Sequence, residues 1–190
     1  MVANDLRGDH LSEAVAKFSN ADSVQRLPGN LFELNPASTG RFDLVIACEV
    51  LEHVAHTVEF LEQLRAFVAP GGHVLITTPN GSYFRNKLPT YSQAGDLSLL
   101  EQRQFKPDAD GHLFLITPGE LRNLAREAGL SIERMVLWGT PLVTGHVRLA
   151  SLASRAACGI CYRSEALAQK LPFAIKEQVC FSMSAVLAVQ

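Results

Sequence analysis

Two carboxylates and an imidazole lie within five consecutive positions, at Glu49, Glu52 and His53. If this stretch forms a helical turn, the spacing i, i+3 and i+4 places all three side chains on one face. Carboxylate and imidazole are both ligands of divalent cations, so the spacing predicts a metal site formed by Glu49, Glu52 and His53. A surface pair of Glu49 and His53 without any metal explains the same spacing, and the sequence leaves both interpretations open.

Two histidines are candidates for proton transfer. The unperturbed pKa of histidine lies near neutrality, so a positioned imidazole can take a proton from a reacting hydroxyl or amine. His53 is the first candidate for this catalytic role, and His112, which follows a long polar segment, is the second. A structural histidine is the alternative at both positions.

The elements that must position these groups form one βαβ unit. Residues 43–48 are a near-continuous apolar run, as in strands buried on both faces of a parallel sheet. Residues 57–68 have the apolar spacing of an amphipathic helix, and a Pro-Gly-Gly turn leads into a second apolar run at 73–78. Ligands of open α/β sheets bind where the strands end, so Cys48 and Glu49 are expected to form the floor of a cleft.

The rest of the chain continues the alternation of strands and helices. We expect a short strand at 1–6, a strand-like segment at 31–34, a helix starting at Thr117, and strands at 131–138 and 179–189. This order predicts an α/β three-layer sandwich with no internal domain boundary. Two long polar or irregular segments, at about 80–111 and 143–171, interrupt the regular pattern.

Composition narrows the class of protein. The 190 residues suit one domain, and 47% hydrophobic with 19% charged residues is typical of a globular chain. The net charge of −2 argues against nucleic acid or an anionic membrane as a partner. No uninterrupted apolar run reaches the length of about 18–20 residues that a membrane span requires, and residues 1–5 lack a signal-peptide pattern. We therefore expect a cytoplasmic protein.

Several motifs together resemble a known family. They are FDLVIACEVLEHV at 42–54, PGG at 70–72, ITTPN at 76–80, GHLF at 111–114, TPGEL at 117–121 and EAGL at 127–130. This combination is similar to the class I S-adenosylmethionine-dependent methyltransferases, and most similar to the branch of ubiquinone-biosynthesis O-methyltransferases. The resemblance covers roughly residues 1–140. It implies a Rossmann-like, mostly parallel sheet with an antiparallel last strand.

The resemblance also implies a cofactor, S-adenosylmethionine, and places residues around it. Asp5, followed by Leu6, falls where related enzymes bind the ribose hydroxyls, and a carboxylate can accept from both hydroxyls. Asn30 falls near the adenine amino group, with Leu31 beside the ring. Asp5 as a turn or cap residue, and Asn30 as a turn residue, are the alternatives.

The same resemblance implies methyl transfer to an oxygen or nitrogen of a small molecule, covered by the segments at about 80–111 and 143–171. It also suggests Mg²⁺ at Glu49, Glu52 and His53. A non-catalytic binding or scaffolding protein that keeps the fold is the alternative function.

One departure from the family is large. Its members begin with a strand and a glycine-rich turn that cradles the cofactor, and this sequence lacks both. The family's first strand lies in the middle of the sheet. We consider three explanations: a gene fragment or wrong start, a relative that no longer binds the cofactor, and a second chain that supplies the missing part. For the chain as given, we expect weak or no cofactor binding.

Overall fold

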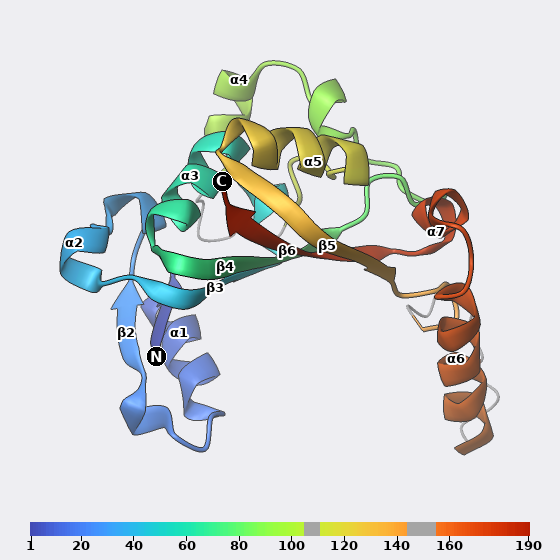
Figure 1. The fold of residues 1–190 in the computed structure, drawn as a ribbon, viewed down its shortest axis with the longest axis horizontal. Coiled ribbons are helices and arrows are strands. Elements are labelled where there is room, and N and C mark those ends of the chain that lie inside the picture. Colours follow the sequence, from blue (N-terminus) through green and yellow to red (C-terminus); the bar gives the residue numbers. More distant parts are fainter. Residues whose placement is uncertain (105–110, 144–154) are drawn as a thin grey trace.

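The structure is a computed structural model that describes residues 1–104, 111–143 and 155–190. Its strands form two sheets instead of one (Figure 1). The smaller sheet pairs β1 (Val2–Asp5) with β2 (Gln25–Pro28). The larger sheet has the order β3 (Phe42–Cys48), β4 (Val68–Pro79), β6 (Ser182–Val189) and β5 (Leu130–Trp138).

Strand directions confirm the predicted class of fold. β1 runs parallel to β2, and β3 runs parallel to β4. The last strand, β6, is antiparallel to both of its neighbours, β4 and β5. The strand pairing is therefore mixed. The strands are also divided between two sheets, in which β1 and β3 are each an edge strand, with none of the described strands between them.

Helices cover the larger sheet on one face. α3 (Thr57–Ala66) and α5 (Pro118–Glu127) lie against this face, while α1 (Gly8–Ala16) packs on the smaller sheet (Figure 1). The buried core between α3, α5 and the sheet includes Leu61, Ile76, Leu121 and Leu187. The opposite face of the larger sheet is open at β3, where Leu44 and Ile46 are 51% and 55% exposed. The third layer of the expected sandwich is therefore incomplete at this edge.

The remaining elements are short or peripheral. They are α2 (Pro36–Thr39), α4 (Leu97–Glu101), α6 (Arg155–Ala168), α7 (Phe173–Val179) and four 3₁₀ turns, η1 (Ala21–Ser23), η2 (Leu31–Glu33), η3 (Leu51–His53) and η4 (Tyr91–Gln93). Within the described ranges, none of the helices has both the length and the apolar character to cross a membrane.

Local sequence signals explain where most elements begin and end. The Thr117 hydroxyl accepts from the Glu120 N–H, and the Glu120 carboxylate accepts from the Thr117 N–H, which forms the capping box at the start of α5. Gly129, with φ of 72°, ends this helix in the left-handed conformation that glycine favours.

One predicted strand was wrong. The segment at 31–34 forms the turn η2, and the strand lies earlier, at Gln25–Pro28. The reason is local: the Asn30 side-chain oxygen accepts from the Phe32 N–H at 3.1 Å and closes the turn. The apolar residues at 31–34 resembled a strand because so short a run does not distinguish the two structures.

The close approach of β3 and β4 depends on Gly72. A Cβ atom at this position would lie 2.8 Å from the carbonyl oxygen of Asp43 and 3.0 Å from that of Phe42. Both neighbours are backbone atoms, which cannot move without shifting β3. The expected Pro-Gly-Gly turn thus lies inside β4, opposite an irregularity in the pairing between Phe42 and Leu44.

We predict that Gly72→Ala lowers the free energy of unfolding by about 1–3 kcal/mol, because overpacking must displace backbone. Gly119→Ala is the matched control, since its Cβ would meet only the Thr117 hydroxyl at 4.0 Å. Urea unfolding followed by circular dichroism measures both. Equal stability of the two variants would contradict the role given to Gly72.

Candidate functional site

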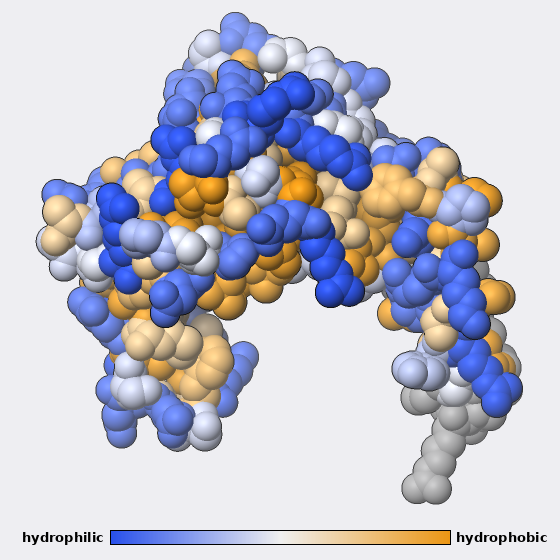
Figure 2. Space-filling view, viewed as in Figure 1, coloured by the Kyte–Doolittle hydropathy of each residue, from blue (hydrophilic) through white to orange (hydrophobic). Residues whose placement is uncertain are grey.

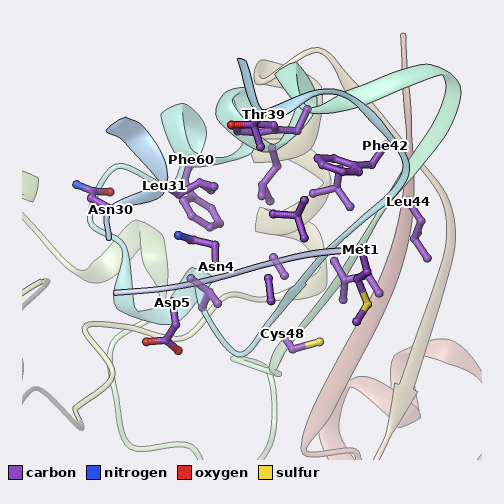
Figure 3. A pocket seen from close by; sticks show the side chains of 18 of the residues that line it. Met1, Asn4, Asp5, Asn30, Leu31, Thr39, Phe42, Leu44, Cys48 and Phe60 are labelled. Atoms are coloured by element: carbon purple, nitrogen blue, oxygen red, sulfur yellow. The ribbon is translucent and has the colours of Figure 1, made fainter. Parts of the chain in front are cut away.

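A cavity of about 790 Å³ occupies the space between β1 and β3 (Figure 3). Asp5 and Asn30 lie at one end of it, and Phe42 and Leu44 lie at the other. Side chains of α3 close it on the side of the core, among them Phe60. Most of its lining is apolar, with polar side chains both where β1 and β3 end and, at Thr39 and Asp43, near the start of β3.

The cavity brings together five of the six residues that sequence analysis assigned to the cofactor. These five are Asp5, Leu6, Asn30, Leu31 and Cys48. They come from the ends of β1 and β3 and from the turn after β2, which are distant in the sequence. The sixth residue, Glu49, is not part of the lining.

The polar residues of the cavity also make the local contacts that a structural role requires. The Asp5 carboxylate accepts from the Arg7 N–H at 2.8 Å, before α1, and Asn30 caps η2. A carboxylate or amide oxygen can accept more than one hydrogen bond, so these contacts leave room for a ligand. Leu31 is half-buried and packs against the core.

Glu49 is directed toward β4 instead of the cavity. Its N–H donates to the Thr77 carbonyl at 2.8 Å, and its carboxylate accepts from the Thr77 hydroxyl at 2.9 Å. Its φ of 52° makes it a non-glycine residue in the left-handed region, where a side chain costs energy. The end of β3 therefore holds a strained residue that the next strand fixes in place.

A second group of functional side chains forms around the turn η3. Glu52 is fully buried, and its Oε2 atom accepts from the Thr78 hydroxyl at 2.9 Å. Its Oε1 atom lacks a hydrogen-bond partner among the described residues. The Nε2 atoms of His53 and His112 each lie 4.0 Å from Oε1. We call Glu52, His53 and His112 the acid–imidazole cluster.

Two contacts fix the imidazoles of this cluster. His53 Nδ1 lies 3.3 Å from the Gly111 carbonyl oxygen, which accepts a hydrogen bond when Nδ1 carries the proton. The rings of His53 and His112 meet edge to face, with centroids 4.9 Å apart. The segment before α5 thereby brings His112 to the loop that follows β3.

Burial changes the proton affinities in the cluster. Removal from water raises the pKa of Glu52 to about 7, against the opposing effect of its hydrogen bonds. Burial, and then the neighbouring His53, lower the pKa of His112. A neutral imidazole at pH 7 can accept a proton, so the cluster suits general-base chemistry.

The cluster differs in membership from the predicted metal site. The structure groups Glu52 and His53 with His112, whose potential ligand atoms all lie within 4.8 Å of one another. Glu49 is engaged with Thr77. The sequence indicated His112 as a candidate base but not its position beside Glu52, because no local sequence pattern relates two residues so far apart in the chain.

Known proteins resemble this chain in sequence. The family profile described as a methyltransferase domain matches residues 8–134. The chain therefore belongs to the methyltransferase domain family. Within the sequence-related proteins, the ubiquinone biosynthesis O-methyltransferase of Acinetobacter baylyi is 34% identical over 154 residues, and that of Thiobacillus denitrificans is 32% identical over 99 residues.

These matches cover 77% and 52% of this chain, but only 62% and 40% of the two relatives. The chain thus spans about half the length of the curated relatives it matches, and the activity of a whole relative is not established for it.

Solved structures support the fold alone. A methyltransferase named CcbJ from Streptomyces caelestis has a TM-score of 0.59 at 14% identity, covering 100% of this chain and 79% of its own. The trans-methyltransferase CalH, solved in complex with SAH, has a TM-score of 0.58 at 17% identity, covering 100% of this chain and 42% of its own. At such identities the similarity concerns the path of the backbone.

We predict that Glu52 makes stability depend on pH. The pKa of Glu52 is raised in the folded state. Its contribution to the free energy of unfolding is therefore fully present below the unfolded pKa near 4.5 and is lost as pH rises toward 7. Relative to Glu52→Gln, the wild-type free energy of unfolding should fall by about 3 kcal/mol between pH 4.5 and 7.5 in metal-free buffer.

Denaturant unfolding at a series of pH values measures this difference. Glu62→Gln on α3 is the matched control, because Glu62 is exposed and is not among the groups that shift the pKa of Glu52. Parallel pH profiles for wild type and Glu52→Gln would contradict the prediction.

Proposed function

We propose that this chain carries the larger part of an S-adenosylmethionine-dependent methyltransferase that acts on an oxygen or nitrogen of a small molecule. One observation carries the proposal: five of the six residues expected to bind the cofactor line one cavity, and the acid–imidazole cluster follows directly in the chain. Val50 and Val54 line the cavity, while Glu52 and His53 lie between them in sequence.

The cofactor is proposed to bind at the polar end of the cavity. Asp5 accepts from the ribose hydroxyls, Asn30 accepts from the adenine amino group, and Leu31 lies beside the ring. Cys48 closes the floor. The sequence similarity to ubiquinone biosynthesis O-methyltransferases supports this assignment, and so does the complex of CalH with SAH.

The reaction proposed is an in-line displacement at the methyl carbon. A lone pair of the acceptor forms the new bond to carbon, the carbon–sulfur bond breaks, and S-adenosylhomocysteine (SAH) leaves. The acceptor proton passes to His53 or His112, whose imidazoles can act as bases at the edge of the site. Alignment of donor and acceptor by the protein supplies several kcal/mol of the rate enhancement, about 7 or more in favourable cases.

The acceptor is proposed to lie between the cluster and the segment at about 80–111. In its described part this segment forms η4 and α4, and the Gln104 side chain accepts from the Ala55 N–H at 2.7 Å. That contact ties the segment to the turn that carries His53. The second segment expected to cover the acceptor is 143–171. Its first part, residues 144–154, lies outside the described residues.

The acid–imidazole cluster also fits a divalent cation. The buried, unpartnered Oε1 atom of Glu52 is the supporting observation, since such an atom lacks compensation for its lost hydration. Two imidazoles and one carboxylate suit Zn²⁺ or Mn²⁺ better than Mg²⁺, which prefers oxygen ligands. A cation held there would lower the pKa of an acceptor hydroxyl.

Titration with SAH tests the cofactor site. We expect weak binding by this chain, with a dissociation constant above about 0.1 mM, because one wall of the cavity is open. Asp5→Asn should weaken it at least tenfold through the loss of a charged acceptor. Asp22→Asn, an exposed acid in η1 outside the cavity, is the matched control.

Ligand-observed NMR at millimolar SAH measures both variants. In one outcome, wild type and control both fail to bind SAH, alone and when mixed with a second chain that supplies the family's glycine-rich turn. In that case the scaffolding alternative would replace the enzyme.

Titration with Zn²⁺ and Mn²⁺ tests the cation site. His112→Ala should weaken binding at least tenfold, because it removes one of three ligands. Glu49→Gln should change affinity less than about twofold. Calorimetry is the measurement. A larger loss in Glu49→Gln than in His112→Ala would restore the site predicted from sequence spacing.

A further inference from the structure

A side chain of α3 holds both ends of the turn η2. The Gln63 Nε2 atom donates to the carbonyl oxygens of Leu31 at 3.0 Å and of Leu34 at 2.8 Å. Leu31 is the first residue of η2, and Leu34 is the residue that follows it. Because a side-chain amide has two protons on one nitrogen, Gln63 can donate to both carbonyls at once. One half-buried side chain therefore spans the whole turn.

An aromatic contact joins the same two elements. Phe60 lies three residues before Gln63, so both side chains are on one face of α3. The Phe60 ring meets the Phe32 ring edge to face, with centroids 6.1 Å apart. Phe60 also lines the cavity, together with Asn30 and Leu31 (Figure 3). Contacts from α3 thus set the position of η2 at the cavity.

The turn in turn orients the Asn30 amide. The Asn30 side-chain oxygen accepts from the Phe32 N–H at 3.1 Å. Reversing the amide would place its NH₂ group against that N–H, so that two donors would face each other. In Figure 3 the Asn30 oxygen lies on the side of Leu31, and the nitrogen points away from it. The turn therefore presents an acceptor, and not a donor, beside Leu31.

Most of the cavity wall is unable to select one base over another. Figure 2 shows apolar surface along the larger sheet, on the side of the smaller one, and most of the lining residues are apolar. Apolar groups contact any planar base, whereas specificity comes from a few placed polar groups. A 6-aminopurine can donate to the Asn30 oxygen, but the carbonyl of a 6-oxopurine would meet it acceptor to acceptor. Selection between these bases depends on the orientation of one amide.

From these contacts we infer that Gln63 is a positioning residue for the recognition of a 6-aminopurine, the base of S-adenosylmethionine. By bonding both carbonyls of η2, Gln63 keeps the Phe32 N–H on the Asn30 oxygen and so disfavours a 6-oxopurine. Gln63 is not part of the cavity lining, so it acts only through the turn. Selection of the base rests on the proposed function, whereas the hold on the turn does not.

Hydrogen exchange followed by NMR tests the hold on the turn. Gln63→Met removes both donors with little change in side-chain length or helix propensity. We expect the amides of Glu33 and Leu34, whose hydrogen bonds close η2, to exchange about fivefold faster in this variant. The Phe60 amide lies in α3 and should keep its exchange rate, which separates loss of the turn from unfolding of the helix.

Two further variants control this experiment. Gln169→Met is the matched control, because the Gln169 amide also donates to a backbone carbonyl, that of Leu137 at 2.8 Å, outside the cavity. It should leave exchange in η2 unchanged. Gln63→Lys keeps N–H donors on a longer side chain and should return exchange to within about twofold of wild type. Unchanged exchange in Gln63→Met would overturn the inference, and so would equal acceleration in Gln63→Met and Gln63→Lys.

Binding of adenosine and inosine tests the selection of the base. Inosine carries a carbonyl in place of the 6-amino group, and ligand-observed NMR at millimolar nucleoside measures both affinities. We expect Gln63→Met to lower the ratio of adenosine to inosine affinity about fivefold, because the Asn30 amide can then rotate and donate. Inosine affinity should not fall. A purely structural defect would weaken both nucleosides equally, and that result would overturn the inference.

The wild-type result separates this inference from the proposed function. A preference for adenosine in wild type that Gln63→Met retains would support the cofactor site and overturn the role of Gln63. If wild type binds neither nucleoside, selection of the base fails together with the proposed function. Faster exchange in η2 of Gln63→Met would then still support the hold of Gln63 on the turn.

Discussion

The parallel pairing of β3 with β4 is the constraint on which the candidate site depends. It brings the carboxyl ends of two strands to one edge, where Thr77 fixes Glu49 and Thr78 fixes Glu52. Each carboxylate is held by a hydroxyl from the neighbouring strand, so a change in register by one residue would separate both pairs. Gly72 permits this register because the backbones meet too closely for a Cβ.

The same edge has two chemically different sides. Toward β1, polar groups border an apolar cavity that suits a nucleoside. At the turn η3, the buried Glu52 carboxyl lies 4.0 Å from two imidazoles, and the Thr78 hydroxyl donates to one of its oxygens.

Much of this organisation could be read from the sequence. The apolar run before Glu49 predicted a strand, although the burial expected of it was wrong, because β3 lies at a sheet edge where Leu44 and Ile46 are more than half exposed. Its parallel pairing with the run at 73–78 and the helix start at Thr117 were predicted correctly. These predictions succeeded because they depend on side-chain periodicity and on contacts within a few residues. The strand predicted at 31–34 was wrong because a single hydrogen bond from the Asn30 side chain favours a turn over an extended chain.

The sequence by itself determined most of the strands, the start of α5 and five of the residues that meet at the cavity, since local patterns and a family resemblance specify these. Only the tertiary structure decided that Glu49 faces Thr77, that His112 joins Glu52 and His53, and that β1 and β3 border one cavity. Such contacts join residues distant in the chain, and their geometry follows from how the sheets and loops pack. Burial, the cause of the raised pKa of Glu52, likewise exists only once the chain has folded.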